Sequence, residues 1–171
     1  MTEGGIQYPK DEASMMFRRK ILVWLATGFG LGLSPFAPGT VGSIWGVLMA
    51  FAINGNLHEP WKQTLVAVIL ALVSIPICDA GEKYFGTKDP HPVVADEYLT
   101  FPLCVIGLPP EPWIFAAAFV TNRALDIVKP FPARRLQRLP GGLGIAVDDM
   151  VSSLYSLAVN WAIYGIAMRW L

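Results

Sequence analysis

Residues 122–150 read NRALDIVKPFPARRLQRLPGGLGIAVDDM, and the rest of the chain is organised around this polar stretch. It lies between two long apolar segments and contains three carboxylates, five basic residues and a glycine-rich turn. Arg123, Asp126 and Lys129 follow one another at intervals of three residues, so they share one face of a helix. Pro130 cannot continue that helix, which predicts a helix end just before it.

The second half of the stretch combines a turn at residues 141–144, GGLG, with the adjacent acids Asp148 and Asp149. Carboxylate oxygens hold a hard cation such as Mg²⁺, while backbone N–H groups and basic side chains hold a phosphate. The sequence therefore predicts a metal-dependent phosphoryl site at a membrane edge. A simpler explanation for the two aspartates is that they cap the N-terminus of the final helix.

The composition favours a membrane protein. Hydrophobic residues make up 54% of the chain and charged residues 15%, against roughly 45–50% and about 25% in ordinary globular proteins. The uncharged run 150–168 is long enough for one membrane crossing, and the run 21–57 for nearly two. The alternative is a hydrophobic soluble bundle. The 13 basic and 13 acidic residues balance, so no global field favours a nucleic acid partner.

The first apolar run is interrupted by Pro35, Pro38 and Gly39, which cannot continue a regular helix. Thr40 and Ser43 add hydroxyl groups just after this break. Irregular backbone at membrane depth is tolerated where protein or water covers it, so the break is typical of a re-entrant turn that lines a polar cavity. A plain loop between two helices fits the same spacing.

A helical hairpin is predicted from residues 93–107 and a second helix that starts near residue 112. At about 1.5 Å per residue, the acids near the start of the first helix and those near the end of the second lie at similar depth. We therefore expect four polar side chains to meet: Asp96, Glu97, Arg123 and Asp126.

The predicted fold is all-α, a compact multihelical membrane bundle with a broken or re-entrant first helical segment and this hairpin. Residues 1–17 are expected to be a flexible polar N-terminus, and residues 18–171 a single domain. Basic residues gather at 18–20, 83–88 and 129–138 but are absent from the connections 55–61 and 107–113, apart from Lys62 at the edge of the first. This asymmetry follows the positive-inside pattern, which puts the acids on the cytoplasmic side.

Four segments, in this order and spacing, resemble the phosphatidylglycerophosphatase A family. They cover most of the chain from residue 28 to residue 156 and are GFGLGLSPFAPGTVGS (28–43), DPHPVVADEY (89–98), RALDIVKPFPARRL (123–136) and GGLGIAVDD (141–149). The resemblance implies a compact helical enzyme in the inner membrane of a bacterium, multi-pass and with its site facing the cytoplasm. It also implies magnesium-dependent removal of the terminal phosphate of phosphatidylglycerophosphate, which leaves phosphatidylglycerol.

Carried over by position, the resemblance assigns roles to nine residues. The expected metal ligands are Asp96, Glu97, Asp126, Asp148 and Asp149. The expected catalytic residues are four of these acids, Asp96, Glu97, Asp126 and Asp149. The expected phosphate-binding residues are Arg123, Lys129, Thr40 and Ser43.

The chain departs from the family pattern at Asn122, Thr100 and Gln137, where the family usually has an aromatic residue, a glycine and an aspartate. The missing aspartate at 137 bears on any scheme that needs it as a ligand or base. The rival function is a small transporter or ion pathway with an acidic intramembrane site. The number of metal ions, the choice between water and an aspartyl-phosphate, and the oligomeric state stay open.

Overall fold

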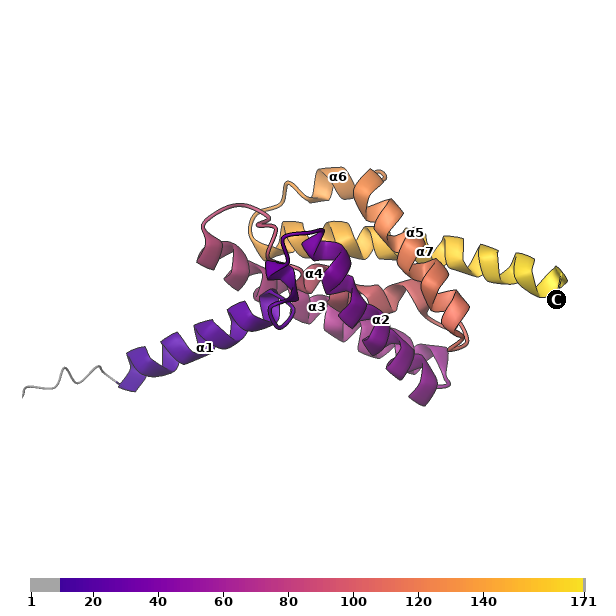
Figure 1. Ribbon diagram of the computed structural model, residues 1–171, viewed down its shortest axis with the longest axis horizontal. Helices are drawn as coiled ribbons and strands as arrows, with labels where there is room; N and C mark the ends of the chain where they lie inside the picture. Colours follow the sequence, from indigo (N-terminus) through magenta and orange to yellow (C-terminus); the bar gives the residue numbers. More distant parts are fainter. Residues whose placement is uncertain (1–9, 171) are drawn as a thin grey trace, which may run out of the picture.

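The computed structural model describes residues 10–170, with side chains from residue 18 onward. This part of the chain is all-helical, as predicted (Figure 1). Its elements are α1 (Lys10–Ala26), η1 (Leu31–Leu33), α2 (Pro38–Asn56), α3 (Pro60–Phe85), α4 (Ala95–Thr100), η2 (Phe101–Val105), α5 (Pro112–Val128), α6 (Ala133–Leu136) and α7 (Gly142–Trp170).

Prolines and left-handed residues set most helix boundaries. Pro38, Pro60 and Pro112 open α2, α3 and α5, where the absent N–H of proline costs no helical hydrogen bond. Gly86 and Lys129 cap α3 and α5 in the left-handed conformation. The predicted helix end before Pro130 is therefore confirmed.

The segment formed by α4 and η2 is the centre of the bundle. Phe101, Cys104 and Val105 are completely buried, and α2, α3, α5 and α7 all pack around them. The helix predicted for 93–107 is not regular: it tightens to a 3₁₀ helix at Phe101 because Pro102 cannot donate an α-helical hydrogen bond. The predicted pairing of this segment with α5 is confirmed by their shared hydrophobic core.

Two glycines let α2 approach this centre closely. A Cβ atom on Gly42 would lie 2.7 Å from Cβ of Val94, and one on Gly46 would lie 2.6 Å from Cβ of Phe101. No side chain fits in either place. The glycine-bearing face of α2 is thus fixed against the central segment, and its opposite face is left open.

The structure contains two helices that are long and apolar enough to cross a membrane, α3 with 26 residues and α7 with 29. Run 21–57, which the sequence shows to be long enough for nearly two crossings, contains residues 21–26 of α1 and the 19-residue α2, and neither is one of these two helices. Helix α1 ends at Ala26, whose carbonyl accepts a hydrogen bond from the backbone N–H of Val94. The predicted break in the first helical segment is confirmed. It separates α2 from α1, which projects from the bundle (Figure 1).

Helix α1 begins at Lys10, within the segment predicted as a flexible N-terminus. The remainder of that segment, residues 1–9, lies outside the described residues. Cys78 and Cys104 are buried free thiols, which fits the role of small core residues.

Candidate active site

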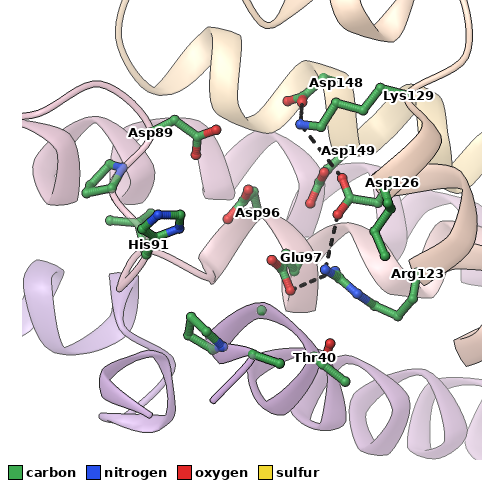
Figure 2. Close-up of a pocket in the computed structure, with 16 residues that line it drawn as sticks. Thr40, Asp89, His91, Asp96, Glu97, Arg123, Asp126, Lys129, Asp148 and Asp149 are labelled. Carbon is green, nitrogen blue, oxygen red and sulfur yellow. Dashed lines mark hydrogen bonds and ion pairs between the residues drawn. The ribbon is translucent and has the colours of Figure 1, made fainter. Parts of the chain in front are cut away.

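A polar cavity of about 380 Å³ lies where α4, the start of α2, the end of α5 and the first turns of α7 meet (Figure 2). Six carboxylates line it against one arginine and one lysine. They are Asp89, Asp96, Glu97, Asp126, Asp148 and Asp149, with Arg123 and Lys129. Six acids minus two bases leave an excess of four negative charges when all are ionised, which favours a bound cation.

Three of these acids form a compact group. Asp126 of α5 and the pair Asp148 and Asp149 of α7 each offer one carboxylate oxygen, and the three oxygens lie within 4.8 Å of one another. Asp148 is 2% exposed and Asp149 5% exposed, so water cannot screen their charges. Buried carboxylates at this spacing match the donor set of a hard divalent cation.

Asp96 and Glu97, which the sequence also predicted as metal ligands, line the same cavity from α4. Neither contributes an oxygen to the group of three described above. Asp96 is buried and accepts a weak hydrogen bond from Sγ of Cys78 at 3.9 Å. The predicted acidic centre therefore has two walls, one on α4 and one on α5 and α7 (Figure 2).

Arg123 and Lys129 connect these walls. Arg123 pairs through Nη1 with Oε2 of Glu97 at 2.9 Å and through Nη2 with Oδ2 of Asp126 at 3.2 Å. Lys129 donates to Asp148 and lies 3.9 Å from Oδ1 of Asp126. The predicted meeting of Glu97, Arg123 and Asp126 is confirmed, and so is the shared helix face of Arg123, Asp126 and Lys129.

The start of α2 closes the cavity from a third side. Ser43 donates from Oγ to Oε2 of Glu97 at 3.0 Å and accepts from Nη1 of Arg123 at 3.4 Å. Gly39 touches the same carboxylate so closely that a Cβ atom there would lie 2.0 Å from Oε1 of Glu97. Thr40 lines the cavity beside it. The proline-glycine break is thus a turn that lines a polar cavity rather than a plain loop.

Burial decides the protonation behaviour of the α4 wall. It raises the pKa of Asp96 well above its usual range, and the charge of Glu97 adds to the rise. It raises the pKa of Glu97 to about 7, although the Arg123 guanidinium opposes the change. Burial also disfavours the charged form of Lys129, but its hydrogen bond to Asp148 and the negative charges of Asp148, Asp126 and Asp149 together outweigh this and raise the pKa of the lysine. Without a further positive charge, burial thus favours the protonated forms of both acids of α4.

The glycine-rich turn has a different role from the one predicted. Helix α7 begins at Gly142, so Asp148 and Asp149 lie well inside it and cannot be N-caps. A Cβ atom on Gly142 would lie 2.1 Å from the carbonyl oxygen of Ile75, which shows that the glycine allows α7 to pack on α3. None of residues 141–144 lines the cavity, so the turn is not its phosphate cradle.

Two cavity residues were missed from the sequence, Asp89 and His91. Both belong to the segment DPHPVVADEY (89–98). Its prolines predict a turn, so neither residue was assigned to the site. Asp89 has a positive φ of 48° and accepts a hydrogen bond at Oδ2 from the side-chain amide of Gln137 at 2.9 Å. Gln137 itself does not line the cavity. The amide at this position therefore touches the site only through Asp89.

An all-helical chain with three clustered carboxylates, an arginine and a lysine around one cavity has the features of a cation- and phosphate-binding protein. The chain belongs to the Phosphatidylglycerophosphatase A family, whose sequence profile matches residues 24–164. This membership confirms the predicted resemblance and makes the chain an enzyme of the lipid phosphatase class.

Individual relatives agree with this assignment. The chain is 35% identical over 149 residues to phosphatidylglycerophosphatase A of Escherichia coli (strain K12), covering 85% of this chain and 83% of that protein. It is 34% identical over 142 residues to phosphatidylglycerophosphatase A of Haemophilus influenzae, covering 81% and 86%. A Bacteroides thetaiotaomicron protein, provisionally named a phosphatidylinositol-3-phosphatase, is 33% identical over 140 residues, covering 78% and 87%. No solved structure is significantly similar to the chain.

Proposed function

We propose that this protein hydrolyses the phosphate monoester of phosphatidylglycerophosphate, with Mg²⁺ as cofactor, to give phosphatidylglycerol and phosphate. The observation that carries the proposal is the group of carboxylate oxygens from Asp126, Asp148 and Asp149, beside Arg123 and Lys129 in a chain of the lipid phosphatase class. Two of the three relatives described above are named for this reaction.

Asp126, Asp148 and Asp149 are the residues that would hold the cation. Their oxygens are hard donors, they are close enough to share one ion, and they are too buried to stay charged without a positive partner. When bound, Mg²⁺ supplies charge neutralisation at the phosphoryl oxygens. Because Asp96 and Glu97 on α4 line the same cavity outside this group of three, the acids present are sufficient for one ion or two.

Arg123 and Lys129 are proposed to orient the phosphate. Each now pairs with acids of the cavity, so a phosphate that enters can take over some of their hydrogen bonds. Thr40 lines the cavity at the start of α2, where its hydroxyl group can donate to a phosphate oxygen. Ser43, predicted to bind phosphate as well, does not line the cavity; it is completely buried, and its hydroxyl holds Glu97 instead. The contacts of Arg123, Lys129 and Thr40 stabilise charge that spreads over the equatorial oxygens in the transition state.

Asp96 and Glu97 are proposed to handle protons. In hydrolysis the bond from phosphorus to the glycerol oxygen breaks, a bond from phosphorus to a water oxygen forms, and a proton reaches the glycerol oxygen. Glu97 has a pKa near neutrality and can accept or return such a proton at physiological pH. A route in which an aspartate attacks phosphorus first is equally compatible with the acids of this cavity.

The proposed setting is the bacterial inner membrane, crossed more than once, with the cavity on the cytoplasmic side. The long apolar helices α3 and α7 support membrane insertion. Basic residues near the cavity, at 83–88 and 129–138, support the cytoplasmic orientation by the positive-inside pattern. A scissile phosphate at headgroup level would then reach the cavity without leaving the bilayer surface.

The transporter alternative is less well supported. Substrate pathways distribute polar groups through the depth of the membrane, often on inverted repeats. Here the acids gather in one cavity at one end of the bundle, and the sequence contains no internal repeat. The same arrangement is what a surface-facing phosphatase requires.

The test is phosphate release by purified protein in detergent micelles, with and without Mg²⁺. We expect Mg²⁺-dependent release from phosphatidylglycerophosphate, and slower release from phosphatidylinositol-3-phosphate, which the name of the Bacteroides relative makes the natural competitor. Faster turnover of the inositol lipid would overturn the headgroup assignment. Equal release in Mg²⁺ and in a chelator would overturn the cofactor.

A further inference from the structure

A second cavity, apolar rather than polar, opens between α2 and α5. It has a volume of about 490 Å³, within the range of about 300–1,000 Å³ that small-molecule sites occupy. All nine residues that line it are apolar: Ile44, Val47, Leu48, Phe51, Pro112, Phe115, Ala116, Phe119 and Val120. We call it the α2–α5 groove.

The packing of the bundle creates this groove. Helix α2 turns its glycine face to the central segment, and α5 buries Ile114, Phe115 and Ala118 in the core around the same segment. The two helices therefore meet the core separately and leave a furrow between them. Its floor includes Val47 and Phe119, which are partly buried, and its rims carry exposed side chains such as Leu48 at 55% and Val120 at 65%.

The groove and the polar cavity lie on the same faces of α2 and α5, at successive positions along each helix. On α2, Thr40 lines the cavity, and Ile44 and Leu48 follow at intervals of four residues on the same helix face. On α5, Ile127 lines the cavity, and Val120, two turns nearer the N-terminus on the same face, lines the groove. The hydrogen bond from Arg123 to Ser43 joins the two helices between the residues that line the cavity and those that line the groove.

We propose that the α2–α5 groove binds an acyl chain of the lipid whose phosphate is hydrolysed in the polar cavity. This proposal rests on the proposed function, since it places the second part of the same amphiphilic substrate. A phosphate ester in the cavity has its apolar part on the side away from the acids, and the groove is the apolar depression that leads from there. Along α2 the groove extends from Ile44 to Phe51, seven residues or roughly 10 Å at 1.5 Å per residue.

An acyl chain fits the groove better than a second copy of this chain or an unrelated helix does. A protein partner needs a broad complementary surface, whereas the groove is a furrow between two helices that ends at the phosphate site. Its aromatic lining includes Phe51 and Phe115, whose rings pack edge to face at 5.3 Å between centroids.

The test fills the groove without touching the polar cavity. Ala116→Trp puts a large ring into the groove at an exposed position, and Ala162→Trp is the matched control on the exposed face of α7. The catalytic efficiency kcat/KM is measured with the dipalmitoyl lipid and with its deacylated water-soluble headgroup. We expect Ala116→Trp to lower the efficiency for the dipalmitoyl lipid at least about tenfold and to leave the headgroup unchanged. Ala162→Trp should change neither.

Unchanged efficiency with both substrates in Ala116→Trp would overturn the proposal, as would an equal loss with both. Conversion of a dimer to a monomer by Ala116→Trp, measured by light scattering in detergent, would assign the groove to a second copy and also overturn it. A lipid phosphate with a photoreactive acyl chain gives an independent readout that does not require hydrolysis. Labelling concentrated at residues 44–51 and 115–120 supports the groove, and equal labelling of the exposed face of α3 contradicts it. The proposed function fails separately, if the wild-type enzyme releases no phosphate from the lipid.

Discussion

Two pairs of adjacent acids line the polar cavity, Asp96 and Glu97 on α4 and Asp148 and Asp149 on α7, and they occupy different environments. In each pair one acid is held by a cation: Glu97 of α4 pairs with Arg123, and Asp148 of α7 pairs with Lys129. The other acid, Asp96 or Asp149, is buried and forms no ion pair in the part of the chain that the structure describes.

The two pairs of acids differ in the side chains that lie beside them. The α7 pair has Asp126 beside it, and oxygens of the three acids lie within 4.8 Å of one another. The α4 pair instead has the Ser43 hydroxyl and the thiol of Cys78 as neighbours. Two similar acidic dipeptides therefore support a cation site on one wall and a site for proton transfer on the other.

The largest expected effect comes from exchanging one carboxylate oxygen for an amide on each wall. Asp149→Asn should lower phosphate release by about 1,000-fold or more, because it removes a charge from the proposed cation site. Asp96→Asn, its matched counterpart on α4, should cost only roughly 10–100-fold, as expected for a neighbouring group. Steady-state assays at saturating Mg²⁺ compare the two. A larger loss in Asp96→Asn would reverse the roles of the walls.

The arginine that joins the walls should come next. Arg123→Lys keeps the charge but cannot contact Glu97 and Asp126 through two nitrogens at once, so we expect a loss of roughly 100-fold in kcat/KM. The loss should be present with the lipid and with its soluble headgroup alike, since Arg123 is proposed to act on the phosphate. Full activity in this variant would contradict that assignment.

The α4 wall makes a prediction about pH and stability in the absence of a cation. Folded Glu97 has a pKa of about 7, above the reference value of 4.5, so the folded state binds this proton more tightly than the unfolded chain. Its contribution to stability is present below about pH 4.5 and is lost as the pH rises through about 7. In chelator, Tm should fall by a few degrees across this window. Glu97→Gln should flatten the fall, and an unchanged slope would contradict the assignment.

The smallest expected effect concerns Gln137, at the position where the family usually has aspartate. Its amide holds Asp89 but does not line the cavity, so Gln137→Ala should reduce activity by no more than about threefold. Asp89→Asn, which changes the cavity itself, should cost more. If Gln137→Ala abolished phosphate release while thermal unfolding stayed unchanged, Gln137 would have a direct role.

Helix periodicity was enough to predict part of the site. The three-residue spacing of Arg123, Asp126 and Lys129 fixes a common face whatever surrounds it, and Pro130 must end the helix. The meeting of α4 with α5 also followed, because helix lengths set depth. Local rules of this kind hold when one element determines the answer.

The other features of the fold and the site could not be predicted from local sequence rules, because they depend on tertiary packing. Gly142 and Gly144 are poor helix formers in isolation, yet they lie in α7 because close contact with α3 and with the preceding turn leaves no room for a side chain. Asp89 was missed because an acid before a proline is typical of a turn, and only the folded chain brings it to the cavity. Likewise, nothing in the sequence predicts that α1 ends at Ala26 and so contains only residues 21–26 of the first apolar run.

The most direct test of the central claim is a measurement of divalent cation binding that does not depend on activity. Titration calorimetry with Mg²⁺ on the purified protein, repeated with Asp149→Asn and Asp96→Asn, compares the two walls. The account predicts binding to the wild-type protein, loss of that binding in Asp149→Asn and retention in Asp96→Asn. Unchanged Mg²⁺ binding in Asp149→Asn would contradict it.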